Sequence, residues 1–394
     1  MPNLARALRG LERFEPVLDA LPGPAYLVGG TVRDLLLGAA PRYDFDLAVV
    51  GDSEAYARAL AERLNGRLTA HDRFGTATVH YGDGAHVDVA TARTETYASP
   101  AALPDVAPAA SIEEDLARRD FTINAMAVAV PDGELVDPFD GARHLRDELV
   151  RVLHERSFVD DPTRIFRAAR YETRLAFRMD PKTETLALQA ARDVLLLSGA
   201  RIREELIAIL EEDNPERTLA RLAQLGVADA LRLTFARPGL QGRLRELAAM
   251  YELGLPLWHL GLLSIHGPPG WMDELRFPRR VAESVETAQR EEPQLRERLA
   301  NARDPADVVH AVEDAGADTA LLALAREESP ALREYFERLR RVRLDVDGDD
   351  LAALGLVESP RVGEVLAELR RRKLNGELPS RAEELAAARE LIDT

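Results

Sequence analysis

The stretch Gly29-Gly30-Thr31-Val32-Arg33-Asp34, followed by Asp44-Phe45-Asp46, decides how the first part of this chain folds. Apolar residues 25–28 before the glycines predict a strand, and residues 31–37 after them predict a helix. Two glycines at such a junction leave backbone N–H groups free at the positive end of the helix, where a phosphate can approach without a Cβ in its way. The alternative is a tight strand-to-helix turn with an ion pair between Arg33 and Asp34.

Asp44 and Asp46 stand on a second predicted strand, over residues 44–50. Residues i and i+2 of a strand point to the same face, so the two carboxylates project together. Like charges this close are costly unless a cation neutralises them, and oxygen ligands near a phosphate-binding turn suit Mg²⁺. Asp88, within a predicted strand over 86–91, can bring a third carboxylate to that face; its alternative is an exposed strand aspartate.

The run Arg118-Arg119-Asp120-Phe121-Thr122-Ile123-Asn124-Ala125 supplies a second group of polar residues. Asp120 and Asn124 lie on one face if this segment is helical. A carboxylate beside an amide can bind a ribose hydroxyl, and Arg119 can bind triphosphate oxygens. The alternative is a salt-bridged turn.

A third group begins at Asp160-Asp161-Pro162-Thr163-Arg164. Pro162 is typical of the first position of a helix, which makes Asp161 an N-cap in the simplest interpretation.

Arg164, Arg167, Arg170 and Arg174 recur at spacings of three and four, so we expect an arginine row along one helix face. A solvated face seldom carries so many like charges without acidic partners at i±4. The formal net charge of −17 argues against a generally basic, nucleic-acid-coating surface. The row therefore predicts a local basic groove that can hold a polyanion.

Length and composition limit the class of protein. A chain of 394 residues is expected to hold more than one domain, and 46% hydrophobic with 30% charged residues is typical of a soluble globular protein. The absence of cysteine excludes disulfides, thiolate zinc sites and cysteine nucleophiles. We find no N-terminal signal pattern and no apolar run long enough to span a bilayer, and we therefore expect a cytoplasmic protein with no membrane partner.

The pattern of predicted elements changes near residue 140. Before it the sequence predicts mixed α/β structure; after it nearly everything reads as amphipathic helix. Besides those above, the predicted elements are helices over 4–21 and 53–64, strands over 77–81 and 125–130, and a Pro- and Ala-rich loop over 98–110.

These motifs, in this order, resemble those of the class II tRNA nucleotidyltransferases, which include the CCA-adding enzymes and bacterial poly(A) polymerases of the polymerase-β-like superfamily. Gly29 to Asp34 with Asp44 and Asp46 is similar to that family's metal and triphosphate motif, 118–125 to its ribose motif, and 160–164 to the motif by which the protein itself serves as base template. Residues 347–355 and 374–378 also resemble the family's C-terminal region.

The resemblance implies an α/β nucleotidyltransferase head followed by an all-α region. The corresponding domains are a head over 1–140, a helical neck with the base-template motif over 141–200, a helical body over 201–275 and a tRNA-binding helical tail over 276–394.

The resemblance also implies an activity: Mg²⁺-dependent addition of C or A, from CTP or ATP, to the 3′ end of tRNA, with release of pyrophosphate. The implied catalytic residues are Asp44, Asp46 and Asp88, with Mg²⁺ held by Asp44 and Asp46. The implied nucleotide-binding residues are Gly29, Gly30, Arg33, Arg119, Asp120, Asn124, Asp161, Arg164, Arg167 and Arg170. Asp160 departs from the family pattern, which has Glu there.

The sequence leaves several alternatives open. The enzyme could add CCA, only CC or only A, or act as a poly(A) polymerase on other RNA 3′ ends. A non-catalytic RNA-binding protein that uses the arginine row, or a nucleotidyltransferase acting on an antibiotic or on protein, are rival interpretations. Oligomeric state is not encoded in any pattern we recognise.

Overall fold

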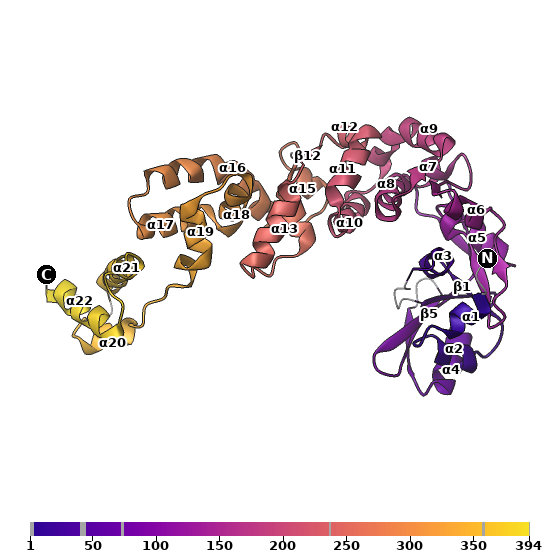
Figure 1. The fold of residues 1–394 in the computed structure, drawn as a ribbon, viewed down its shortest axis with the longest axis horizontal. Helices are drawn as coiled ribbons and strands as arrows, with labels where there is room; N and C mark the ends of the chain where they lie inside the picture. The colour runs from indigo at the N-terminus through magenta and orange to yellow at the C-terminus, as the bar shows by residue number, and fades with distance from the viewer. Residues whose placement is uncertain (1–3, 40–44, 72–74, 236–237, 357–358, 394) are drawn as a thin grey trace. The chain divides into compact units, whose positions relative to one another are not determined.

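A computed structural model describes residues 4–39, 45–71, 75–235, 238–356 and 359–393 (Figure 1). The chain divides into two compact units, Met1–Arg232 and Leu233–Thr394. The predicted fold class, an α/β part followed by helices, is confirmed. The finer division at residues 140, 200 and 275 stays a prediction.

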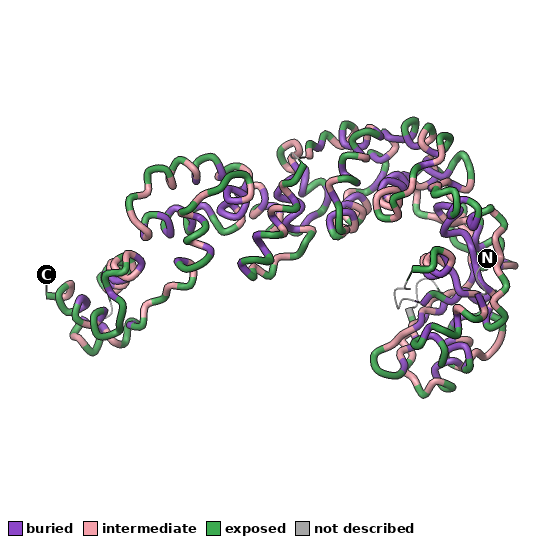
Figure 2. Tube along the Cα trace, in the orientation of Figure 1, coloured by how far each residue is buried: buried purple, intermediate pink, exposed green. Residues whose placement is uncertain are grey.

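Unit 1 is built on a seven-stranded sheet in the order β3-β4-β5-β2-β1-β8-β9. In sequence order these strands are β1 (Ala25–Val28), β2 (Phe45–Val49), β3 (Arg67–His71), β4 (Thr76–Tyr81), β5 (Ala85–Thr91), β8 (Ala127–Val130) and β9 (Leu135–Val136). In β4 half-buried residues alternate with buried ones, so one face of that strand packs on the core. Figure 2 marks buried residues in purple and exposed ones in green along the chain. Helix α4 (Ser53–Arg63) packs against this sheet (Figure 1).

The register of the central strands positions the acidic residues. Strands β2 and β5 run parallel with Asp46 opposite Asp88, and β1 runs antiparallel to β2 with Val28 opposite Asp46. Helix α3 (Gly30–Leu37) begins where β1 ends, as predicted. Gly29 between them has φ +79°, a left-handed conformation that side chains disfavour, and this explains the glycine at that position.

The helix predicted over residues 4–21 is wrong in its extent. The structure has α1 (Leu4–Arg9) and α2 (Glu15–Ala20) instead. Gly10 follows the first helix and Pro16 lies in the first turn of the second, because glycine is a poor helix former and proline is favoured in a first helical turn over a helix interior.

The loop predicted over residues 98–110 is also wrong in part. Strand β7 (Asp105–Pro108) pairs antiparallel with β6 (Arg93–Thr96) in a two-stranded sheet. All of β7 is exposed, so backbone pairing with β6 stabilises it rather than burial of its side chains. A local sequence pattern does not predict such pairing.

The rest of unit 1 is helical. It consists of α5 (Ile112–Ala117), η1 (Thr122–Asn124), α6 (Gly141–Arg146), α7 (Ser157–Asp160), α8 (Thr163–Leu175), α9 (Pro181–Gln189), η2 (Ala191–Leu196), α10 (Gly199–Leu210), α11 (Pro215–Gln224) and α12 (Val227–Leu231). The two-residue strands β10 (Leu149–Val150) and β11 (Arg178–Met179) pair in parallel, a departure from the expectation of helix alone after residue 140. Helix α8 buries Ile165, Phe166, Ala168 and Ala169 and packs against α10 and α11.

Unit 2 is helical apart from the short pair β12 (Thr234–Phe235) and β13 (Ile265–His266). Its helices are α13 (Leu240–Met250), α14 (Leu257–Leu262), α15 (Trp271–Glu274), α16 (Arg279–Asn301), α17 (Pro305–Ala315), α18 (Ala317–Arg326), α19 (Pro330–Glu337), η3 (Leu339–Arg341), α20 (Gly348–Ala353), α21 (Pro360–Leu374) and α22 (Arg381–Asp393). The last three helices share an apolar cluster around Leu351, Leu369 and Ala388. Across the described ranges, no helix combines the length and apolar character that crossing a membrane requires.

Candidate functional site

One pocket in unit 1, with a volume of about 350 Å³, brings together residues from all three groups found in the sequence. Gly29 and Gly30 come from the β1–α3 junction, Arg119, Asp120 and Asn124 from the α5–η1 segment, and Asp161, Arg164 and Arg167 from the start of α8. Arg93, Glu95, Tyr97, Arg118 and Tyr171 complete the lining. Five of these residues are arginines, so the pocket suits an anionic ligand.

The Gly29 turn lies between an acidic and a basic side chain. A Cβ on Gly29 would lie 3.5 Å from Asp46 Oδ2 and 3.6 Å from Arg119 Nη1. The backbone at this turn is therefore open to a ligand that meets both a carboxylate and a guanidinium.

Arg33 lies behind the turn and does not line the pocket. It is buried, and its Nη1 donates to Asn124 Oδ1 at 2.8 Å while its Nη2 pairs with Asp34 Oδ1 at 2.8 Å. The ion pair with Asp34, left open as an alternative, is present. Arg33 thus ties α3 to Asn124.

The acidic residues of the sheet occupy one face. Asp46 is exposed, and Asp88 is half-buried and accepts a hydrogen bond from Thr78 Oγ1 at 2.5 Å. Residues in register on neighbouring strands project to the same side, so Asp46 and Asp88 present carboxylates together. Asp44 lies outside the described residues, and among those described no three His, Asp or Glu side chains are grouped as a metal site. The oxygen donors of Asp46 and Asp88 fit a hard divalent cation.

Asp120 and Asn124 are in direct contact, as the four-residue spacing predicted. Asp120 Oδ1 accepts from Asn124 Nδ2 at 3.1 Å and from the Phe121 N–H at 2.8 Å. The contact forms at the short η1 turn, not along an α-helix. Arg167 Nη2 lies 2.6 Å from Asp120 Oδ2, a close ion pair that is not aligned as a hydrogen bond.

Charges around Asp120 counter the effect of its burial. Burial alone raises the pKa of this carboxyl group, but the Arg167 guanidinium and the Asn124 amide hold the pKa below its usual value. Asp120 in turn raises the pKa of Arg167. Asp120 is therefore an anion that is fixed in place.

Asp161 has both a capping contact and an ion pair. Its Oδ1 accepts from the Thr163 N–H at 3.0 Å and from Thr163 Oγ1 at 2.6 Å, and Arg201 Nη2 lies 2.7 Å from the same oxygen. Arg201, which the sequence analysis did not identify, also donates to the Ala101 carbonyl at 2.9 Å. The orientation of the Asp161 carboxylate is therefore set by three donors on one oxygen.

Arg164 is 4% exposed and lies against the pocket. Its Nη2 donates to the main-chain carbonyl of Arg118 at 2.9 Å, whereas its buried Nη1 has no hydrogen-bond partner among the described residues. A buried donor without a partner is costly, so Arg164 is suited to a ligand acceptor in the pocket. Asp160 points elsewhere and pairs with Arg156 at 3.0 Å.

The arginine row has acidic partners that do not lie at i±4. Besides the Arg167–Asp120 pair, Arg174 Nε donates to Glu212 at 3.0 Å and Arg170 lies 3.9 Å from the same carboxylate. These partners come from other elements, which the i±4 rule does not reach. Only Arg164 and Arg167 of the row line the pocket.

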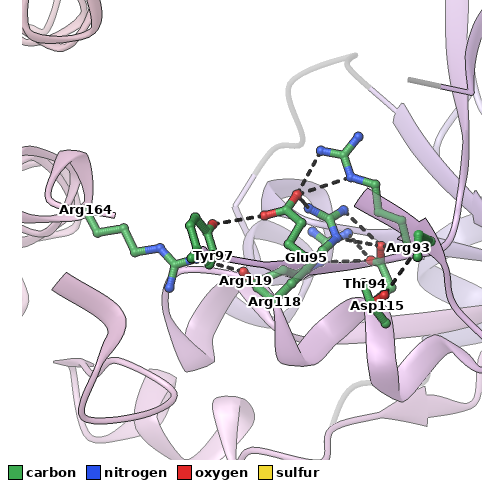
Figure 3. Close-up of polar contacts among 9 residues, drawn as sticks. Arg93, Thr94, Glu95, Tyr97, Asp115, Arg118, Arg119 and Arg164 are labelled. Carbon is green, nitrogen blue, oxygen red and sulfur yellow. Dashed lines mark hydrogen bonds and ion pairs between the residues drawn. The ribbon is translucent and has the colours of Figure 1, made fainter. Parts of the chain in front are cut away.

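A network of charged residues beside the pocket escaped the sequence analysis (Figure 3). Arg93 Nη2 and Arg118 Nη1 both donate to Glu95 Oε1 at 3.0 Å, and the Tyr97 hydroxyl donates to Glu95 Oε2 at 3.1 Å. Burial raises the pKa of Tyr97 to about 12. A signal was present: Arg93, Glu95 and Tyr97 alternate as residues on one face of a strand do.

Comparison with known proteins shows which families this chain is similar to. Residues 25–151 match the family described as "Poly A polymerase head domain", and residues 176–235 match "Probable RNA and SrmB-binding site of polymerase A". An A-adding tRNA nucleotidyltransferase from Halalkalibacterium halodurans is 34% identical over 93% of this chain and 88% of its own length.

Two further proteins extend the comparison. An A-adding tRNA nucleotidyltransferase from Geobacter sulfurreducens is 35% identical over 95% of this chain, which spans only 46% of that relative's length. A solved structure of a CCA-adding enzyme with CTP superposes with a TM-score of 0.80 at 30% identity, covering 100% of this chain and 99% of the other.

Proposed function

Because this chain belongs to the tRNA nucleotidyltransferase and poly(A) polymerase family, we propose that it adds nucleotides from ATP or CTP to the 3′ end of tRNA and releases pyrophosphate. The observation that carries the proposal is the single pocket in which the Gly29 turn, the Asp120–Asn124 pair and the Asp161–Arg164 pair meet. A nucleoside triphosphate has the three corresponding parts: phosphates, ribose and base.

In this proposal the 3′-hydroxyl of the RNA attacks the α-phosphate in line and pyrophosphate leaves. Asp44, Asp46 and Asp88 would hold Mg²⁺, which lowers the pKa of the attacking hydroxyl and neutralises charge on the phosphates. The exposed Asp46 in register with Asp88 supports this role. Gly29, Gly30 and Arg119 contact the triphosphate. Arg33 acts indirectly, because it donates a hydrogen bond to Asn124 and does not itself line the pocket.

The same proposal assigns the ribose to Asp120 and Asn124. Asp120 Oδ1 already accepts two hydrogen bonds, and the anion is fixed by Arg167. Such an arrangement positions a ribose hydroxyl without reorganisation when the nucleotide binds.

Base choice follows from donors and acceptors. Cytosine and adenine both present an amino group beside an unprotonated ring nitrogen, so the Asp161 carboxylate accepts from the first while Arg164 donates to the second. Uracil and guanine place a carbonyl oxygen opposite Asp161, and the repulsion excludes them. The partnerless Nη1 of Arg164 supports this assignment.

For the nucleotide added, we propose that the enzyme transfers A to tRNA that already ends in CC. The support is that the two relatives described above, which align over more than nine-tenths of this chain, are both A-adding enzymes. Cytoplasmic location, binding of tRNA by the 276–394 tail and the division into head, neck, body and tail belong to the same proposal.

A primer-extension assay tests the proposal. Purified protein is incubated with Mg²⁺ and labelled ATP or CTP, using tRNA transcripts that lack CCA, lack only the terminal A, or are complete. We expect one A on the transcript ending in CC and no addition without Mg²⁺. Addition of CC or CCA corrects the nucleotide choice, and repeated A addition to unrelated RNA indicates a poly(A) polymerase. If tRNA binds but no triphosphate is consumed, the chain is an RNA-binding protein and the proposal fails.

A further inference from the structure

Asp115, near the end of α5, does not line the pocket but holds two of the arginines that do. Its Oδ1 accepts from Arg118 Nε at 3.0 Å, and its Oδ2 accepts from Arg119 Nη2 at 3.0 Å and Nε at 3.3 Å. The Arg93 N–H also donates to Oδ1 at 3.1 Å. The Asp115 side chain is only 2% exposed.

The buried carboxylate is ionised and its bonds are charge-assisted. Burial by itself raises the pKa of Asp115, but Arg118 and Arg119 together hold that pKa below its usual value. Charge-assisted hydrogen bonds are roughly twice as strong as neutral ones. Asp115 therefore fixes the planes of both guanidinium groups before any ligand arrives.

Arg118 links this network to Arg164 (Figure 3). Its side chain joins Asp115 to Glu95, and its main-chain carbonyl accepts the 2.9 Å bond from Arg164 Nη2. The other terminal nitrogen of Arg164, Nη1, is buried and has no hydrogen-bond partner among the described residues. A continuous chain of contacts thus runs from Asp115 through Arg118 to Arg164.

We propose that Asp115 is a positioning residue that sets the base selectivity of the pocket, because it fixes Arg118 and thereby the orientation of Arg164. The inference rests on the proposed function, since it concerns the nucleotide that Arg164 reads. Loss of the Asp115 charge leaves the Arg118 side chain held by Glu95 alone and freer to turn toward the ligand phosphates. The main-chain carbonyl of Arg118 then shifts. The Arg164 guanidinium, which this carbonyl orients, becomes mobile and can donate to several kinds of base.

Asp115→Asn tests the proposal, with binding of ATP, CTP, UTP and GTP measured by calorimetry in the presence of Mg²⁺ and without RNA. We expect the preference for ATP or CTP over GTP or UTP to fall by about tenfold to a hundredfold, the range expected when an oriented charge-assisted hydrogen bond is lost. Asp115→Glu keeps the charge and should retain part of the preference. This second variant decides the question if the Asn variant does not fold.

Glu292→Gln is the matched control. Glu292 is also buried between two arginines, Arg296 and Arg326, but it belongs to unit 2, whereas all of the pocket residues belong to unit 1. It should lower the melting temperature and leave the nucleotide preference unchanged. If both Asp115 variants keep the wild-type preference and lose only stability, as Glu292→Gln does, Asp115 is merely structural and the inference fails. A wild-type protein that binds none of the four nucleotides contradicts the proposed function itself.

Discussion

Asp46 is exposed on β2, at the edge of the Gly29 turn, and its side chain is not part of the core. Replacing an exposed carboxylate leaves folding nearly unchanged, whereas losing a metal ligand removes charge stabilisation worth several kcal/mol in the transition state. We expect Asp46→Ala to lower kcat by about a thousandfold, or ~4 kcal/mol, without a change in melting temperature. Single-turnover extension of tRNA ending in CC at saturating Mg²⁺ measures the effect. Turnover close to wild type would remove Asp46 from the catalytic set.

Asp161 combines a capping contact with the proposed base contact, and one substitution separates the two. Asn caps a helix about as well as Asp, but Asp161→Asn also removes the charge that pairs with Arg201, so we expect stability to fall by no more than about 1 kcal/mol. The amide can donate where the carboxylate only accepts, so the carbonyl of uracil or guanine becomes acceptable. We expect incorporation of UTP or GTP relative to ATP to rise by roughly tenfold to a hundredfold. Competition assays with mixed nucleotides give this ratio, and an unchanged ratio would leave Asp161 as a cap.

Asp120 links the site to pH through its depressed pKa. A carboxyl group whose pKa is lower folded than unfolded stabilises the fold above its unfolded pKa of about 4, and that stabilisation is lost as pH falls through the folded pKa. We expect Asp120→Asn to reduce stability at pH 7 by roughly 2–4 kcal/mol and to flatten the loss of stability below pH 4. Urea denaturation at several pH values measures both. Asp132→Asn, an exposed aspartate after β8, should change neither.

At the scale of elements, some arginines of the α8 row pair with acidic residues of other elements, and others line the pocket. Arg174 joins α8 to Glu212, just beyond the end of α10, and Tyr171 stacks near both Arg33 and Arg174. The end of the row is therefore held by internal ion pairs. Only its first half, Arg164 and Arg167, reaches the pocket.

Because the two halves of the row make different contacts, we expect substitutions in the second half to affect stability rather than tRNA binding. Arg174→Gln should lower stability by about 1 kcal/mol, a melting shift of roughly 2–4 °C, and leave the salt dependence of tRNA binding unchanged. A binding titration against salt concentration, run beside a thermal scan, measures both quantities. Arg192→Gln, an exposed arginine in η2, serves as the control. A salt slope reduced by about one would mean that Arg174 contacts phosphate after all.

At the scale of the whole molecule, the pocket residues all belong to unit 1. A ligand stabilises only the structure that binds it, by about 2.7 kcal/mol at a hundredfold excess over Kd. We expect calorimetry to resolve two unfolding transitions. Saturating ATP with Mg²⁺ should raise the melting temperature only of the transition that belongs to residues 1–232. Lys373→Met should destabilise the other transition alone, because Lys373 pairs with the fully buried Glu384 in unit 2. A single transition whose melting temperature rises with ATP would show that the two units unfold together.

Local pattern was enough to predict much of this protein. The strand over 25–28, the helix after Gly29 and the two strands that carry Asp46 and Asp88 follow from local patterns along the chain, although the parallel pairing of those two strands does not. Periodicity and steric rules act between near neighbours, so the sequence expresses them directly. Periodicity also indicated the fold class, whereas the family came from the resemblance of the motifs to known ones.

Contacts between distant segments were decided by the tertiary structure alone. Arg164 meets the carbonyl of Arg118 across 46 residues, and Asp161 meets Arg201 across 40. The acidic partners of the arginine row and the pairing of β6 with β7 arise in the same way. Such contacts depend on how the intervening chain folds and packs, and a short-range sequence pattern contains no information about that. The sequence therefore determined which groups the site contains, and the tertiary structure determined which of them are free to meet a ligand and which are held by one another.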